Sequence, residues 1–156
     1  MTEGKPAIRL QRATFVVSDL ERALAFWRDV LGLSVDFVSD SDAASYSYPV
    51  FDVDRSASLR FAVLGAPGQP RMMGLTEVTP ADGAALPPVP HPRRAAVVLD
   101  VADVDGVVAR ARAAGFFAYP EERLVTNDGR TGREIGLVDA DDNLAVVYSI
   151  TGRVEP

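Results

Sequence analysis

Few side chains in this sequence can perform nucleophilic chemistry. The chain contains no cysteine, which excludes a thiolate nucleophile, a disulfide framework and a cysteine-ligated zinc or iron–sulfur site. Its one histidine, His91, lies between Pro90 and Pro92, where we expect it to be exposed and inert. Ser-His-Asp catalysis and any mechanism that needs two histidines within one chain are therefore excluded. The segment 65–68 contains two glycines and a proline and predicts a turn between strands. It does not predict a phosphate-binding loop, because no helix that starts with Lys-Ser/Thr follows it.

Charge and composition exclude further classes of function. The 156 residues include 16 Lys+Arg and 22 Asp+Glu, so the net charge is −6, and 47% of the residues are hydrophobic. This composition is ordinary for a globular protein of one domain. Nucleic-acid binders usually carry a basic stripe, and this sequence has none. No apolar run approaches the roughly 20 residues that span a membrane, and no secretory signal is recognisable. We expect a cytoplasmic protein without nucleic-acid or membrane partners.

An internal repeat organises the elements that must position any functional side chain. Val17-Ser18-Asp19-Leu20-Glu21 resembles Val101-Ala102-Asp103-Val104-Asp105 at an offset of 84 residues. Each segment follows a β-prone run and opens a helical pattern, which ends at Gly32 in the first copy and at Gly115 in the second. Two copies of one supersecondary unit explain this pattern.

The helical patterns are amphipathic. In the first copy, Ser18 and Glu21 predict a capping box at the helix start. The apolar positions that follow share one face, which makes Trp27 a core residue; they are Leu20, Ala23, Leu24, Trp27 and Leu31. The equivalent stripe in the second copy consists of Val104, Val107, Val108 and Ala111.

Each half reads strand–helix–strand–strand–strand. The predicted strands are 7–17, 34–38, 59–64 and 72–78 in the first half, and 95–101, 116–119, 134–138 and 144–150 in the second. Between the halves, residues 79–92 contain five prolines and form a linker, because proline cannot continue a helix or a central strand. The polar stretch 40–48 is expected to be a loop over one side of the sheet.

Three segments resemble the vicinal oxygen chelate superfamily, which includes glyoxalase I, bleomycin-resistance proteins and extradiol dioxygenases. They are residues 12–19, residues 26–33 and the turn Asp139-Ala140-Asp141-Asp142-Asn143. The resemblance implies an α+β fold in which two paired βαβββ modules form a curved mixed sheet around a cleft, with the helices outside. One glyoxalase-like domain would span 1–156, with modules at 7–78 and 93–151 joined by the linker 79–92. It also implies a homodimer.

The same resemblance implies where a metal would be held. Superfamily enzymes use four ligands, usually His, Glu, His and Glu, at equivalent strand positions of the two halves. Carried over position by position, these are Arg12, Glu77, Ala96 and Val146, of which only Glu77 keeps a ligand-type side chain. A guanidinium has no lone pair to offer a cation, and the alkyl side chains have none. We therefore expect no metal and no other cofactor.

These positions and their neighbours give the candidate ligand-binding residues, which are Arg12, Glu77, Tyr148, Val146, Ala96, Met73 and Phe61. Arg12 either is an exposed strand-end arginine, pairs with Glu77, or grips an anionic group of a ligand. Glu77 is a surface carboxylate, the partner of Arg12, or a possible catalytic base. By alternation along a strand, Tyr148 shares a face with Val146 and Met73 shares one with Glu77.

Further candidates for the lining of a cavity are Phe37, Val63, Tyr46 and Tyr48, the two tyrosines being otherwise plain loop residues. Three functions stay open. The first is a metal-independent binding protein for a drug or natural product, with an apolar or aromatic ligand that the negative net charge makes possibly cationic. The second is an active lyase, isomerase or dioxygenase that uses unusual ligands or Glu77 as a base. The third is a structural or regulatory homologue whose own side chains fill its cleft.

Overall fold

The chain folds into two modules that repeat the same order of strands around a helix. The computed structural model describes residue 4 and residues 7–155. The first module consists of β1 (Ala13–Val17), α1 (Leu20–Leu24), the π-helical η1 (Ala25–Val30), β2 (Ser34–Ser41), α2 (Ser47–Val50), β3 (Ser58–Ala66) and β4 (Gln69–Thr79). The second consists of β5 (Ala96–Asp100), α3 (Val104–Ala113), β6 (Glu122–Val125), β7 (Arg130–Val138) and β8 (Leu144–Arg153).

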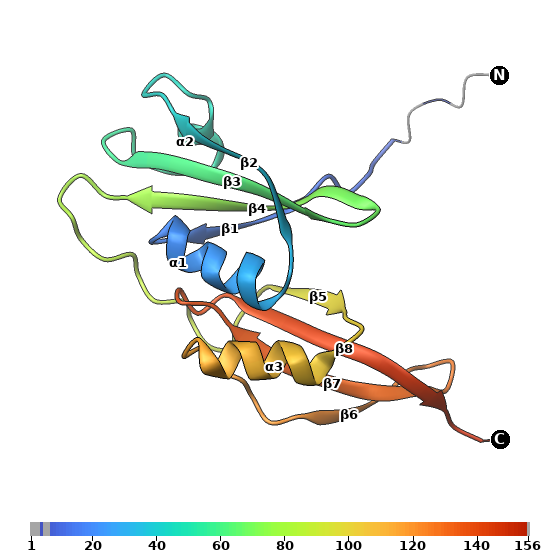
Figure 1. Cartoon of the computed structure of the whole chain (residues 1–156). Coiled ribbons are helices and arrows are strands. Elements are labelled where there is room, and N and C mark those ends of the chain that lie inside the picture. Colours follow the sequence, from blue (N-terminus) through green and yellow to red (C-terminus); the bar gives the residue numbers. More distant parts are fainter. Residues whose placement is uncertain (1–3, 5–6, 156) are drawn as a thin grey trace.

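The two sheets have equivalent topologies. Their strand orders are β1-β4-β3-β2 and β5-β8-β7-β6 (Figure 1). The first strand of each module is parallel to the last one, and the remaining neighbours are antiparallel. This arrangement confirms the predicted α+β fold of two paired βαβββ modules. No helix in the described part of the chain is long and apolar enough to cross a membrane.

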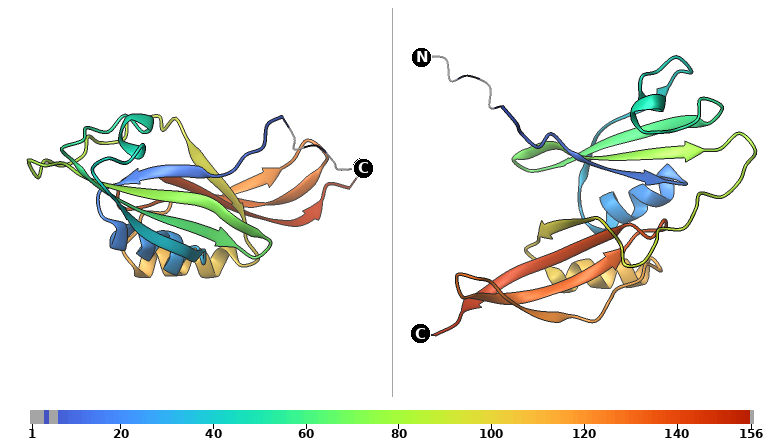
Figure 2. Two further views of the ribbon diagram at one scale, coloured as in Figure 1. Left: turned by 90° about the horizontal axis from the view of Figure 1, so that it is seen from above. Right: turned by 180° about the vertical axis from the view of Figure 1, so that it is seen from behind.

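Both main helices cover the same side of the sheets. Figure 2 (left) shows α1 and α3 together below the strands, and α2 on the opposite side. We call the side under α1 and α3 the helix face and the other side the open face. Side chains of the helix face of both sheets, together with α1, η1 and α3, form one continuous buried cluster that includes Trp27, Leu75, Val107 and Leu137. The two modules therefore share a core.

The faces of β1 and β4 follow from strand alternation. The Phe15 ring stacks on Trp27 of η1 with centroids 5.4 Å apart, so Phe15 belongs to the helix face. Thr14 and Val16 consequently belong to the open face. On β4, Met73 and Leu75 are buried in the core cluster, so Gly74 and Thr76 belong to the open face.

The start of α1 differs from the prediction by one residue. Asp19, not Ser18, precedes the first turn of α1 in an extended conformation, and its carboxylate accepts a hydrogen bond from the Arg22 amide at 3.0 Å. Asp103 does the same for α3 by accepting from the Gly106 amide at 2.8 Å. The predicted Ser18–Glu21 capping box is wrong, because the Ser18 amide instead donates to Asp141 of the second module.

Three further predictions need correction. The strand predicted over 7–17 is shorter, since β1 begins at Ala13. Residues 116–119 do not form a strand: they hold one isolated bridge, between Ala118 and Leu137, and the strand starts beyond Pro120 as β6. Proline lacks the amide that a continuing ladder requires, so pairing restarts after it. The stretch 40–48 is not entirely loop, since β2 runs on to Ser41 and α2 begins at Ser47. The expected linker was 79–92; β4 includes Thr79, and residues 80–95 contain no helix or strand.

Candidate functional site

A cavity of about 320 Å³ lies between α2 and the open face of the first sheet. We call it the α2 cavity. Its floor comes from β1, β3 and β4 and from Arg12, which directly precedes β1; its other walls come from β2 and α2. The lining residues are Arg12, Thr14, Phe37, Ser41, Tyr46, Ser47, Val50, Phe51, Leu59, Phe61, Ala62, Val63, Gly74, Leu75 and Thr76. The rings of Phe37 and Phe61 meet edge to face at 6.0 Å. The cavity is thus an apolar, partly aromatic space with one charged side chain.

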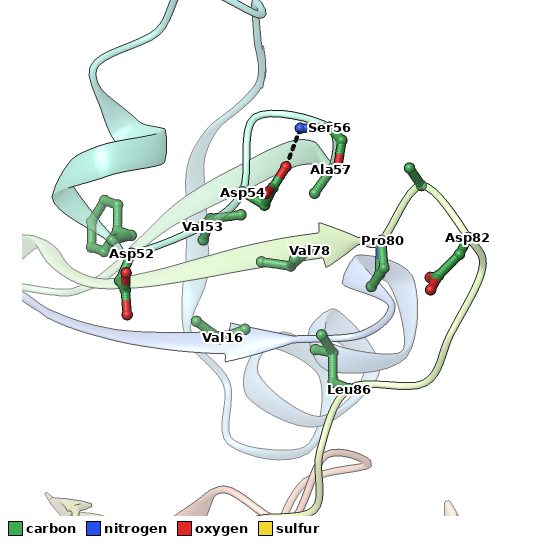
Figure 3. Close-up of a pocket in the computed structure, with 12 residues that line it drawn as sticks. Val16, Asp52, Val53, Asp54, Ser56, Ala57, Val78, Pro80, Asp82 and Leu86 are labelled. Atoms are coloured by element: carbon green, nitrogen blue, oxygen red, sulfur yellow. Dashed lines mark hydrogen bonds between the residues drawn. The ribbon is translucent and has the colours of Figure 1, made fainter.

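A second cavity of about 520 Å³ adjoins the first on the open face and shares Phe51 with it. We call it the loop cavity. Figure 3 shows Val16 and Val78 on the strands, with Asp52, Asp54 and Asp82 on the surrounding loops. Hydrogen bonds from Ser56, including one from its amide at 2.8 Å, lower the pKa of the Asp54 carboxyl. The loop cavity therefore combines an apolar floor with an acidic rim.

Of the seven candidate residues, the structure brings two into the α2 cavity. These are Arg12 and Phe61. The further candidates Phe37, Val63 and Tyr46 line the same space. Tyr48 does not: it is buried beneath α2, where its hydroxyl donates to the Ala57 carbonyl at 2.9 Å.

Glu77 lies on the opposite face of the sheet. Its Oε2 accepts a hydrogen bond from the Leu20 amide at 2.6 Å. The carboxylate thus provides an acceptor for one of the first amides of α1, which have none within the helix. The alternative in which Glu77 pairs with Arg12 is wrong, because Glu77 lies on the helix face whereas Arg12 lines the α2 cavity on the open face. Met73 shares the face of Glu77, as predicted, but that face is the core: Met73 is 1% exposed and lines no cavity wall with Arg12.

The candidates of the second module lie elsewhere. Val146 lines a separate cavity of about 590 Å³ on the second sheet, together with Glu122, Glu134 and His91. Ala96 is exposed at the start of β5, and Tyr148 lines a crevice between the modules. The structure thus distributes the predicted set over several separate places.

His91 is exposed, as expected, and it also has a partner. Its Nε2 lies 2.8 Å from Asp142 Oδ2, and the Arg93 guanidinium bonds to the same aspartate and to the Tyr119 hydroxyl. Hydrogen bonds from Arg93 and His91 outweigh the effect of partial burial, so the pKa of Asp142 is lowered. This network connects the linker to the turn between β7 and β8.

The strand registers test whether the four positions implied by the family resemblance are equivalent in the two modules. Thr14 pairs with Gly74 in the first sheet as Val98 pairs with Val146 in the second, and the repeat offset relates Thr14 to Val98. Gly74 is therefore the counterpart of Val146, and the assignment of that position to Glu77 is wrong. The set becomes Arg12, Gly74, Ala96 and Val146.

None of these four side chains can donate a lone pair to a cation, so the set does not fit a divalent metal. Over residue 4 and residues 7–155, no group of three or more His, Cys, Asp or Glu side chains is arranged to hold one.

Sequence reasoning missed Thr14, Thr76 and Gly74 on the floor of the α2 cavity. A Cβ atom at Gly74 would lie 2.8 Å from Thr14 Oγ1 and 3.6 Å from Arg12 Cδ, so the glycine leaves room beside these two side chains. It also missed Val50 and Phe51. The available signal was their apolar character within an otherwise polar stretch: both are more than 40% exposed.

Comparisons with known proteins agree with this architecture. No curated protein sequence matches the chain. A glyoxalase family protein from Bacillus cereus is similar in structure (TM-score 0.74, 17% identity, 97% of this chain and 99% of that chain). So is a glyoxylase/bleomycin resistance protein/dioxygenase domain from Frankia sp. EAN1pec (0.65, 18%, 97% and 96%). The fosfomycin resistance protein FosX from Listeria monocytogenes, complexed with Mn(II) and sulfate, is another (0.57, 18%, 97% and 93%).

At these identities the structural likenesses show the fold alone. A family model, in contrast, matches most of the sequence, from residue 9 to residue 145. By that match, the chain belongs to the Glyoxalase/Bleomycin resistance protein/Dioxygenase superfamily.

Proposed function

We propose that this protein is a metal-independent binding protein for small apolar or aromatic molecules, and that the α2 cavity is its binding site. The observation that carries this proposal is an apolar cavity on the face where superfamily enzymes hold a metal, in a chain whose four metal-ligand positions are Arg12, Gly74, Ala96 and Val146. Small-molecule sites are typically concave and apolar, with a few polar groups that orient the ligand.

The alternatives receive less support. Glu77 as a catalytic base is disfavoured, because its carboxylate is bonded to the Leu20 amide on the helix face. A cleft filled by the chain's own side chains is disfavoured by the space of about 320 Å³ that remains beneath α2. FosX forms a complex with Mn(II), but its 18% identity to this chain supports a common fold and does not extend to a common metal site.

The experiment measures binding of a neutral two-ring aromatic, 2-naphthamide, by isothermal titration calorimetry in chelator-treated buffer. Val50→Asp places a charge in the wall of the cavity at a residue that is 67% exposed, so folding should be retained. We expect its Kd to rise about tenfold, since a tenfold change corresponds to about 1.4 kcal/mol of lost apolar contact. Val125→Asp, at a 52% exposed valine of β6, is the matched control and should leave Kd unchanged.

Equal weakening by both variants would place the site elsewhere. Elemental analysis of the purified protein supplies the second arm. A divalent metal held stoichiometrically, whose removal abolishes naphthamide binding, would contradict metal independence.

We also propose that the protein acts as a homodimer in the cytoplasm. Val98, on the open face of β5, is 62% exposed. An exposed apolar side chain in the middle of a strand can be buried in the interface between two subunits. Light scattering coupled to size-exclusion chromatography tests the dimer: a monomer mass at micromolar concentration would contradict it.

A further inference from the structure

We infer that the ligand of the α2 cavity is an organic anion, whose carboxylate or sulfonate is bound by Arg12 and whose apolar body contacts Phe37 and Phe61. This inference rests on the proposed function and specifies the chemical class of the ligand. It differs from the expectation of a cationic ligand that the net charge of −6 suggests.

The first observation is that Arg12 has no side-chain partner among the residues that the structure describes. Four arginines are partly buried, namely Arg12, Arg60, Arg93 and Arg133. The last three form ion pairs with carboxylates. Within the described residues, Arg12 has no ion pair and no side-chain hydrogen bond. Partial burial of a charged group is unfavourable when no such partner compensates for the lost water. The other arginines without such a bond are exposed.

The second observation is the charge inside the cavity. Arg12 is the one charged side chain among the lining residues, all of which the structure describes. The Arg71 guanidinium lies 6.0 Å from the centre of the Phe37 ring but is not part of the lining, and the Asp36 carboxylate accepts from the Arg71 amide at 2.8 Å. The net charge of the lining side chains is therefore positive, in contrast to the acidic loop cavity beside it.

The third observation is the arrangement of groups around Arg12. Thr14 Oγ1 and Arg12 Cδ both lie beside the bare backbone of Gly74, and the Thr76 side chain lines the same space. A planar guanidinium and hydroxyl donors together suit the oxygens of a carboxylate or sulfonate. Phe37, Phe61 and Val63 supply apolar surface for the attached body.

Three probes of nearly the same shape test the inference by calorimetry: 2-naphthoate, 2-naphthamide and 2-naphthylmethylammonium. We expect naphthoate to bind about tenfold more tightly than the amide, as a charge-assisted hydrogen bond would give. Arg12→Gln should remove this preference and leave the affinity for the amide within about twofold. Arg94→Gln, at an exposed arginine of the linker region, removes the same charge elsewhere and should keep the preference.

A stability measurement accompanies the titrations. Because Arg12 has no described carboxylate partner to lose, Arg12→Gln should unfold in urea no earlier than the unaltered protein, which shows that any loss of binding is local.

The outcomes separate the two proposals. If the amide binds as tightly as naphthoate, or if Arg12→Gln keeps the preference, the anion inference is overturned while the binding function stands. Tightest binding of the ammonium probe would also overturn it and would direct attention to the acidic loop cavity. If none of the three probes binds, the proposed function itself is contradicted, and the inference with it.

Discussion

Among the buried side chains that the structure describes, Asp139 accepts the most hydrogen bonds, and one of these bonds joins the two modules. It is 5% exposed. Its Oδ2 accepts from Trp27 Nε1 at 3.0 Å and from Asn143 Nδ2 at 3.1 Å, and its Oδ1 accepts from the amides of Asp141 and Asn143 at 2.9 Å. Burial raises the pKa of the Asp139 carboxyl, although these hydrogen bonds act in the opposite direction. The carboxylate therefore links η1 to the turn between β7 and β8 while retaining a cost of desolvation.

The desolvation of the Asp139 carboxylate predicts that the free energy of unfolding depends on pH. Because the folded pKa of Asp139 lies above 3.8, its contribution to stability is fully present below pH 3.8 and is lost as pH rises through the folded pKa. Asp139→Asn cannot titrate. The free energy of unfolding of the unaltered protein, minus that of the variant, should thus be larger near pH 4 than at about pH 7. Urea unfolding followed by Trp27 fluorescence measures the difference at both values, and a difference that is constant or grows with pH would refute the role given to burial.

At the scale of elements, the start of α1 shows how two carboxylates share one helix terminus. Asp19 accepts from the Arg22 amide, and Glu77, from the neighbouring strand β4, accepts from the Leu20 amide. Ser18 remains outside the helix, and its amide reaches Asp141 across the module boundary. Asp103 repeats the role of Asp19 in α3, so the cap is a feature of the repeated unit.

Substitutions at Asp19 and Ser18 test which of the two residues caps α1. Asp19→Ala should lower the free energy of unfolding by about 1 kcal/mol, the usual cost of removing an N-cap side chain. Asp103→Ala should have an effect of the same size on the second module. Ser18→Ala is the matched control and should change stability by less than about 0.5 kcal/mol, since it removes only a hydroxyl that does not cap the helix. Chemical denaturation measures all three, and a larger effect of Ser18→Ala than of Asp19→Ala would restore the capping box.

At the scale of the whole molecule, the modules are joined by their core and by polar contacts. The core cluster includes residues of both sheets and of α1, η1 and α3. Arg110 of α3 donates to the Val30 carbonyl at 3.0 Å, and Asn143 donates to the Val16 carbonyl at 3.2 Å. Neither module can unfold without exposing apolar surface of the other.

The shared core predicts one cooperative unfolding transition. Trp27 fluorescence reports on the junction of the modules, whereas far-ultraviolet circular dichroism reports on the strands and helices of both. In urea the two signals should give the same midpoint, as two-state unfolding requires. A dichroism transition that continues after the fluorescence change is complete would show that the modules unfold separately.

Much of the fold was predictable from local patterns. The repeat with its offset of 84 residues predicted two equivalent modules, and the glycines that end the helical patterns have the left-handed conformations expected of them, with φ of +84° at Gly32 and +82° at Gly115. Such features depend on residues close together in the chain, which is why the sequence alone indicates them. The pairing of this part of the chain with β7 is interrupted at Pro120, which has no amide to donate, and β6 begins beyond it.

The candidate site depended on information that a single strand does not carry. Gly74 and Thr76 face α2, while Met73 and Glu77 face α1, and a shift of one residue along β4 would exchange the two sets. The sequence by itself determined the family, the order of elements and the scarcity of catalytic and metal-binding side chains. Only the tertiary structure decided which face of β4 lines the cavity and that Arg12 lies there without Glu77, because strand register and the packing of α2 arise from contacts between distant segments.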